Sequence, residues 1–279
     1  MAIKLFPFQK EAVMNALKNS FYLLCVRVGG GKTLIAMFYA KLLLSKKLAD
    51  KVIFACTVSA SVAVRGEFKE KLGIEVPQYE NIWDFVNFLE SGKKVCVIKH
   101  SLFEKLGYNA ELIKHLKSLS KTGLRVSLII DEAHKLNNPK SKGHIGYSNI
   151  KFIFDRVLLM TATPYSSCLS QLYGVIHLII PKLWKSSAEF FRRYIEEDVI
   201  MVNGRIKFKE KVAYKNLKEL REIISPFTFF YYPKIKLNFQ NHVVRLKDYT
   251  EYDEICKGVL TPNELLRVSK SESKGENKE

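Results

Sequence analysis

The sequence predicts an α/β fold built on a mostly parallel, doubly wound sheet. Apolar runs rich in β-forming residues recur along the 279 residues, at 21–28, 52–56, 95–98, 126–130 and 157–160. Segments in which apolar residues recur with helical spacing occupy 9–18, 34–44 and 82–89. Strands that alternate with helices form parallel βαβ units, and runs with so few polar residues are typical of strands buried on both faces.

The first apolar run ends in a turn with the composition of a phosphate-binding loop. The turn reads Gly29, Gly30, Gly31, Lys32 and Thr33. Backbone N–H groups in such a turn, and at the start of the helix that follows, point at one spot and suit a phosphate chain. The Lys32 ammonium can reach the β- and γ-phosphates, and the Thr33 hydroxyl is a hard oxygen ligand for Mg²⁺. An ordinary glycine turn is the alternative, because Val26 stands where the eight-residue pattern has its first glycine.

The fourth apolar run ends at two carboxylates, Asp131 and Glu132, with Ala133 and His134 directly after them. Asp131 would hold the metal through water, and Glu132 would position or deprotonate an attacking water. For this string alone, a solvated acidic face is the alternative. The carboxyl ends of parallel strands meet at one edge, where open α/β sheets bind ligands. The two strings together therefore predict a site for a nucleoside triphosphate and Mg²⁺.

Composition predicts an intracellular protein that binds a polyanion. The net charge is +17, from 45 Lys and Arg against 28 Asp and Glu, and a lysine-rich proteome is the alternative explanation. Because no apolar run reaches 18 residues and the first ten residues lack the features of a signal peptide, we expect no membrane span and a cytoplasmic location. The five cysteines are an odd number without metal spacing, so we expect reduced core residues.

The pattern changes after Pro181, which suggests a division of the chain. We expect a nucleotide-binding domain at 1–180, an α-rich insertion at 181–235, a connecting segment at 236–266 and a disordered tail at 267–279. In the insertion, 187–196 and 216–224 have helical spacing, and Asn203-Gly204 within 198–208 predicts a hairpin. We expect no further sheet unit there, and residues 227–232 are expected to cross back toward the core.

The order of these motifs resembles the first RecA-like domain of superfamily 2 helicases, and specifically the Swi/Snf-type translocases of double-stranded DNA. The resemblance covers residues 3–253. Its most diagnostic stretch is 131–142, which runs from Asp131-Glu132-Ala133-His134 to Lys140 and Lys142. The resemblance implies a RecA-like P-loop NTPase fold, ATP and Mg²⁺ as substrate and cofactor, and a phosphate loop that tolerates Val26.

The resemblance also implies roles for single residues. Gln9, in the segment 5–9, would read the adenine edge, although a residue at a helix start needs no such role. Ser59, with Thr57 and Val64 where the family usually has proline and tryptophan, would lie in a loop that contacts the DNA backbone. Ser101 would make a second backbone contact, or else cap a helix. Lys140 and Lys142 would add contacts to the nucleic acid.

The coupling motif at 158–164 resembles the segment that relays the state of the nucleotide to the nucleic acid. Thr161 and Thr163 would supply the hydroxyls of this relay, and His134 would contact them. The remaining histidines that we considered show no ligand spacing and are expected to be structural or exposed: His115, His144, His177 and His242.

The segment 241–252 resembles the strand that leads into the second RecA-like domain of this family. We therefore expect the ATP-binding half of a DNA helicase or translocase, with the second domain supplied by another chain or by a missing C-terminal part. Such a chain would be a weak ATPase by itself. Two alternatives stay open: a nucleotide-gated nucleic-acid-binding module without motor activity, and an RNA-directed superfamily 2 helicase, which Thr161-Ala162-Thr163 suggests.

Overall fold

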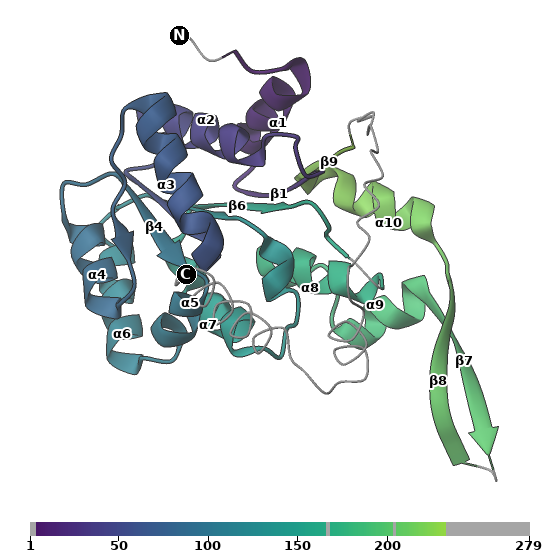
Figure 1. Ribbon diagram of the computed structural model, residues 1–279. Coiled ribbons are helices and arrows are strands. Elements are labelled where there is room, and N and C mark those ends of the chain that lie inside the picture. Colours follow the sequence, from purple (N-terminus) through teal and green to yellow (C-terminus); the bar gives the residue numbers. More distant parts are fainter. Residues whose placement is uncertain (1–3, 166–167, 203–204, 233–279) are drawn as a thin grey trace, which may run out of the picture. The chain divides into compact units, whose positions relative to one another are not determined.

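The computed structural model describes residues 4–165, 168–202 and 205–232 (Figure 1). All of these residues fall in one compact unit. The turn Asn203-Gly204, the expected connecting segment at 236–266 and the expected tail at 267–279 lie outside the described residues. None of the described helices is long and apolar enough to cross a membrane.

A seven-stranded sheet with the order β3-β4-β2-β5-β6-β1-β9 forms the centre of this unit. Its strands are β1 (Phe21–Val26), β2 (Lys51–Cys56), β3 (Gln78–Tyr79), β4 (Val95–Lys99), β5 (Val126–Ile130), β6 (Arg156–Thr161) and β9 (Thr228–Tyr231). All six pairings between neighbouring strands are parallel. The predicted α/β fold with its parallel, doubly wound sheet is confirmed.

Helices cover both faces of the sheet (Figure 1). The helices on one face are α1 (Pro7–Lys18), α2 (Lys32–Ser45) and α3 (Val58–Leu72). The other face is covered by α4 (Ile82–Glu90), α5 (Ser101–Gly107), α6 (Ala110–Ser120), α7 (Lys142–Ile150) and α8 (Ser170–Ile179). Side chains along β1 alternate between the two cores, with Leu24 in the first and Leu23 and Cys25 in the second. This double burial explains why the strand sequences are almost wholly apolar.

The segment after α8, where we expect the insertion, contains two helices and a hairpin. Helix α9 (Ser187–Tyr194) leads into β7 (Ile195–Val202), which pairs antiparallel with β8 (Arg205–Tyr214), and α10 (Leu217–Ile224) follows. The predicted hairpin is confirmed, and it begins at Ile195, so the first predicted helix ends two residues earlier than expected. The short 3-10 helices η1 (Ala133–Leu136), η2 (Lys151–Ile153) and η3 (Ser225–Phe227) complete the described elements.

Strand β9 corrects one expectation about this region. It lies at the edge of the main sheet and pairs with β1, from Leu23 opposite Thr228 to Val26 opposite Tyr231. The segment does cross back to the core, as expected, but it also extends the sheet. Its partner lies about two hundred positions earlier in the chain, and local periodicity carries no information about such a pairing.

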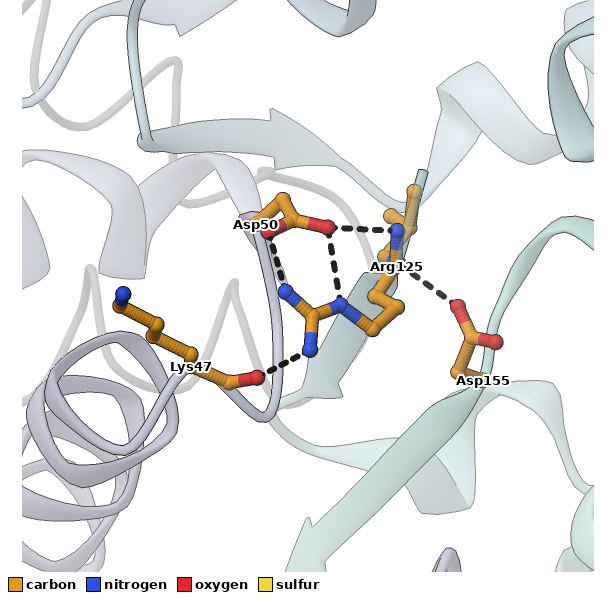
Figure 2. Close-up of polar contacts among 5 residues, drawn as sticks. Lys47, Asp50, Arg125 and Asp155 are labelled. Atoms are coloured by element: carbon orange, nitrogen blue, oxygen red, sulfur yellow. Dashed lines mark hydrogen bonds and ion pairs between the residues drawn. The ribbon is translucent and has the colours of Figure 1, made fainter. Parts of the chain in front are cut away.

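A charged network joins the amino ends of three strands (Figure 2). Arg125, just before β5, donates from Nε and Nη2 to Asp50 Oδ2 and Oδ1 at 3.0 and 2.7 Å, and it also donates to the Lys47 carbonyl. Its guanidinium holds the pKa of Asp50 below its usual range. Asp155 accepts a hydrogen bond of 2.8 Å from the backbone N–H of Val126. These contacts fix the amino ends of β2, β5 and β6. The carboxyl ends of the same strands lie at the opposite edge of the sheet.

Candidate functional site

The carboxyl edge of the sheet brings the predicted nucleotide-binding residues together. Strands β5, β6 and β1 are neighbours. The acidic motif follows β5, the coupling motif ends β6 and the phosphate loop follows β1. Strand β2 lies next to β5 in the sheet and β4 lies next to β2, and the carboxyl ends of β2 and β4 lead to Ser59 and Ser101.

The phosphate loop ends in a left-handed residue at the start of α2. Gly31 has a φ of 76° and no side chain to cap the helix, so the first N–H groups of α2 have no side-chain cap. Lys32 is the first residue of the helix, and its side chain is 12% exposed. Lys32 Nζ lies 3.5 Å from the Val26 carbonyl oxygen and 3.9 Å from Glu132 Oε1. Uncapped N–H groups, the helix dipole and a nearby ammonium together favour an anion, and Thr33 stands half-buried in the same turn.

Gln9 ties this loop to the start of α1. Its Oε1 accepts a hydrogen bond of 2.9 Å from the backbone N–H of Phe6, and its Nε2 donates to the Gly30 carbonyl at 3.1 Å. The side chain is buried. A Cβ on Gly30 would overlap the side chain of Val26, so the loop packs against the residue that replaces the usual first glycine. Gln9 therefore forms part of the loop's support, and its reading of adenine stays a prediction.

Asp131 has a carboxylate oxygen that no described residue partners. Its residue is buried, and Oδ1 makes no hydrogen bond among the described residues. Burial, together with the neighbouring charge of Glu132, raises the pKa of Asp131 to about 6, although Lys32 opposes this shift. A buried, unsatisfied carboxylate oxygen is the kind of ligand that a hard divalent cation takes, so the donor set of Asp131 and the Thr33 hydroxyl fits Mg²⁺.

Glu132 occupies a strained position at the junction of β5 and η1. It has a φ of 49°, which is the left-handed region and costs a residue with a side chain about 1–3 kcal/mol. Its two carboxylate oxygens face different partners. Oε1 lies toward Lys32, and Oε2 lies 3.1 Å from His134 Nδ1. Glu132 thus stands between the phosphate loop and the rest of the acidic motif.

His134 continues the chain of contacts to the coupling motif. Its Nδ1 lies 3.0 Å from Thr161 Oγ1, and Thr161 Oγ1 accepts a hydrogen bond of 3.1 Å from the backbone N–H of Thr163. Thr161 is buried, whereas Thr163 is exposed. The expected contact between His134 and a coupling threonine is therefore present, and the coupling role itself stays a prediction.

Two hollows extend from the acidic motif toward the predicted DNA contacts. The first, of about 500 Å³, is bordered by Glu132, Ser59 and Thr163. Ser59 lies exposed in the first turn of α3, which Thr57 caps by accepting a hydrogen bond of 3.3 Å from the Ala60 N–H. Thr57, where the family usually has proline, therefore has a local structural use.

The second hollow, of about 330 Å³, is bordered by Ser101, His100 and Lys135, and Lys135 also borders the first. Ser101 is the exposed first residue of α5 and does not cap it. His100 Nε2 is buried without a hydrogen-bond partner among the described residues, and burial lowers the pKa of His100 to about 4. Lys140 and Lys142 are exposed just beyond η1.

His115, His144 and His177 lie away from the predicted nucleotide-binding residues. His115 pairs with Glu90 at 2.9 Å on the surface. His144 Nε2 lies 3.0 Å from His177 Nδ1, and His144 Nδ1 lies 2.7 Å from the Leu136 carbonyl oxygen. His242 lies outside the described residues. The two paired histidines are structural, in agreement with the expectation.

Tyr231 is a neighbour of the phosphate loop that the sequence did not reveal. Its carbonyl accepts a hydrogen bond of 3.3 Å from the N–H of Arg27, two residues before Gly29. Its ring stacks on Phe8 with 3.9 Å between the ring centroids. The only signal was the aromatic composition of 227–232, which says nothing about position. The returning strand β9 therefore supports both the loop and α1.

A family model described as the SNF2-related domain matches residues 40–245 of this chain. The chain belongs to this family. The matched range holds the acidic and coupling motifs, and the phosphate loop lies just before it. The SNF2-related chain is 28% identical over 222 residues to a homologue of SWI/SNF-related matrix-associated actin-dependent regulator of chromatin subfamily A-like protein 1 from Caenorhabditis elegans, with 79% of this chain and 30% of the relative covered.

Other comparisons point the same way. Chromatin-remodeling ATPase INO80 from Saccharomyces cerevisiae is 27% identical over 146 residues, which cover 52% of this chain and 9% of that protein. The solved SWI2/SNF2 ATPase core of Sulfolobus solfataricus in complex with double-stranded DNA matches with a TM-score of 0.60 at 17% identity, over 83% of this chain and 45% of that one. The SNF2-related chain thus has the fold of this core and spans less than half the length of these proteins.

Proposed function

We propose that this SNF2-related domain is the ATP-binding half of a motor that moves along DNA. The observation that carries the proposal is the unbroken series of contacts from Lys32 through Glu132 and His134 to Thr161. This series links the phosphate loop to the carboxyl ends of β5 and β6, next to the hollow that Ser59 borders. A domain that only stored nucleotide would not need such a link.

In this proposal, Lys32 changes partner when ATP binds. Its ammonium lies 3.9 Å from Glu132 Oε1, and the γ-phosphate would attract it more strongly than one carboxylate does. Glu132 is then free to accept a proton from water. The water oxygen bonds to the γ-phosphorus as the bond to the bridging oxygen breaks, which leaves ADP and phosphate. Mg²⁺, held by Thr33 and Asp131, would offset the charge of the phosphates.

Double-stranded DNA is the proposed track. Ser59 and Ser101 are exposed at the ends of adjacent strands, and Lys135, Lys140 and Lys142 lie exposed beside or beyond the acidic motif. The net charge of +17 favours a polyanion. In the proposal, a second RecA-like domain, from another polypeptide or from further sequence, supplies the opposite wall of the ATP site and of the track.

Binding of labelled duplexes at several salt concentrations tests the DNA partner. If the domain neutralises about four phosphates, the logarithm of the association constant should fall with the logarithm of salt with a slope of about −3.6. Duplexes of unrelated sequence should bind equally, because the predicted contacts are to the backbone. A slope near zero, or tight binding to one sequence alone, would contradict the proposal.

Two rival functions are separated by further arms of the same experiment. Structured RNA that competes better than duplex DNA would favour an RNA-directed enzyme. A nucleotide-gated module without motor activity would bind DNA, yet its ATP hydrolysis would not respond to DNA even when a second RecA-like domain is added.

A further inference from the structure

A groove lies at the amino edge of the sheet, away from the nucleotide-binding residues. It has a volume of about 820 Å³. It is bordered by α3, by the end of α2, by the segment that follows α3 and by the loop that enters β4. Since all the neighbouring strands are parallel, the first residues of β4 mark the edge opposite to the phosphate loop. Nothing in the proposed function uses this groove.

The floor of the groove is apolar and lacks a partner in the described part of the chain. Val62, on α3, is 73% exposed, and Ile74 is 39% exposed. Gly66 lies in the interior of the same helix, where glycine is less stable than alanine. A Cβ at Gly66 would meet no atom within 4 Å. The packing of the described chain therefore does not call for glycine at this position, and the small residue leaves room for an incoming side chain.

The rim of the groove is basic. Arg65, Lys69, Lys93 and Lys94 border it, against the single carboxylate of Glu75. Lys69 pairs with Glu75 at 2.8 Å and offsets its charge. Lys93 and Lys94 have no carboxylate within ion-pair distance among the described residues, and Arg65 donates from Nε to the Val76 carbonyl at 2.9 Å. The positive rim therefore stays largely uncompensated.

We propose that this groove docks a segment of a partner protein in which acidic side chains flank one or two aliphatic ones. The acidic groups would meet the basic rim, and an aliphatic group would enter the space over Gly66 between Val62 and Ile74. The apolar floor favours this occupant over nucleic acid, whose phosphates need cations only. The chain's own last residues, 269–279, contain no aliphatic side chain and as many lysines as glutamates, so they fit poorly.

A segment docked in this groove would contact α3, the helix whose first turn carries Ser59. The first turn of α3 carries Ser59, and its later turns carry Val62, Gly66 and Lys69 along the groove. A segment bound along these later turns would hold the helix from the side opposite to the nucleotide edge. The groove is thus a place where a partner reaches the motor domain without covering the ATP site.

Fluorescence anisotropy with a labelled peptide tests the proposal on the full chain. The probe is a peptide of about 14 residues in which two leucines, four positions apart, are flanked by glutamates. We expect saturable binding at physiological salt, and Gly66→Trp should weaken it by about tenfold or more because the indole fills the floor. Gly66→Ala is the matched control, since it leaves the space open and favours the helix. It should retain binding and melt no lower than the wild type.

Charge variants give a second test that does not depend on filling the groove. Lys94→Glu should weaken binding of the peptide, whereas Lys121→Glu, at the end of α6, should not. A peptide with serine in place of both leucines should bind weakly. The proposal is overturned if the leucine peptide does not bind, or if the serine peptide binds with the same affinity. It is also overturned if Gly66→Trp and Lys94→Glu bind the leucine peptide like the wild type, or if duplex DNA displaces the peptide from the groove. Displacement by a peptide of residues 251–268, in which carboxylates stand beside aliphatic side chains, would assign the groove to the chain itself.

Discussion

At the residue scale, the Asp131 carboxylate that suits a cation also lowers the free energy of unfolding when no cation is bound. Its ordinary pKa of 3.8 is raised to about 6, mainly by burial. As pH rises from the ordinary value through the raised one, the folded protein must give up a proton that the unfolded chain has already lost. The free energy of unfolding falls over that range, and the loss is fully present above the raised pKa. A cation bound at Oδ1 would reverse this loss.

Replacing Asp131 with asparagine should therefore stabilise the protein without metal. At pH 7.5 in the presence of a chelator, Asp131→Asn should unfold with a free energy higher by up to about 3 kcal/mol, and the gain should shrink at pH 5. Chemical denaturation of both proteins at the two pH values measures it. Asp84→Asn, in the first turn of α4, is the control. If Asp131→Asn is less stable than wild type at pH 7.5, then Asp131 is not an unsatisfied anion.

Lys32 is the complementary case, a cation that the proposed function places beside a phosphate. Lys32→Ala should lower the affinity for ATP with Mg²⁺ by about 1.5–3 kcal/mol, because a charge-assisted contact to phosphate is lost. Its melting temperature should change little, since the ammonium makes one ion pair of 3.9 Å and one long hydrogen bond. Calorimetric titration and thermal melting measure both, with the exposed Lys41→Ala on the same helix as control. Unchanged nucleotide affinity would refute the phosphate-loop assignment.

At the scale of elements, α1 and β9 both support the predicted phosphate loop. Gln9 bonds the loop to the amino end of α1, and Tyr231 bonds it to β9 while stacking on Phe8. These contacts involve three parts of the chain that are far apart in sequence. The conformation of the loop therefore depends on the packing of the edge strand β9 as well as on the nucleotide.

Gln9→Ala tests whether this residue acts through the loop or on the base. Loss of the buried hydrogen bond to Gly30 should weaken binding of ATP and of GTP by a similar factor of about ten, because the loop serves both. Nucleotide titrations measure the two affinities, with the exposed Lys10→Ala as control. A loss confined to ATP would show instead that the Gln9 amide reads adenine.

Helices α7 and α8 connect the acidic motif to the insertion. His144, Tyr147 and Lys151 stand on one side of α7 and its end, and they contact His177 and the carbonyls of Leu178 and Ile179 in turn. Burial lowers the pKa of Lys151 to about 8 and that of His144 to about 4. Because Tyr147 and Lys151 satisfy the last carbonyls of α8, the expected insertion begins from a fixed point beside α7 and η2.

The strands that helices cover on both faces were predicted most accurately from the sequence. The apolar runs at β1, β2, β4, β5 and β6 were each predicted within two residues, because burial on both faces excludes polar residues. The two-residue β3 was too short to show a pattern, and β9 depends on a distant partner. At the site, the motifs gave the residues at the strand ends. They gave neither the left-handed backbone of Glu132 nor the attachment of Gln9 to Gly30, since both depend on packing between separate elements.

At the scale of the described unit, the two proposed sites lie at opposite edges of one parallel sheet. The carboxyl edge carries Lys32, Asp131 and Glu132, and the amino edge carries the Arg125 network and the basic groove. In an open parallel sheet, small ligands bind at the carboxyl ends of the strands. Charged side chains at the amino edge are therefore not needed for nucleotide binding and can contact a partner protein.

The isolated chain should hydrolyse ATP very slowly, and a second RecA-like domain added in trans should raise the rate greatly. In the proposed function, Lys32, Thr33, Asp131 and Glu132 would all lie on one side of the triphosphate. Charge that develops on the other side would need a cation such as an arginine finger, which is typically worth about 10³ to 10⁵ in rate. Of the three arginines considered as substitutes, Arg156, Arg192 and Arg193, two are engaged elsewhere.

Arg156 begins β6 at the amino edge and donates to the carbonyls of Leu17 and Asn19 at 3.0 and 3.2 Å, and Arg193 pairs with Glu219 at 2.7 Å. Arg192, on the same helix as Arg193, belongs to the insertion. None of the three is in contact with the phosphate loop. Steady-state hydrolysis by the purified chain, with and without duplex DNA and with and without a second domain, measures the expected gain. Robust DNA-stimulated turnover by the chain alone, first order in protein, would mean that the domain completes its own site, and the search for the missing cation would then return to Arg192.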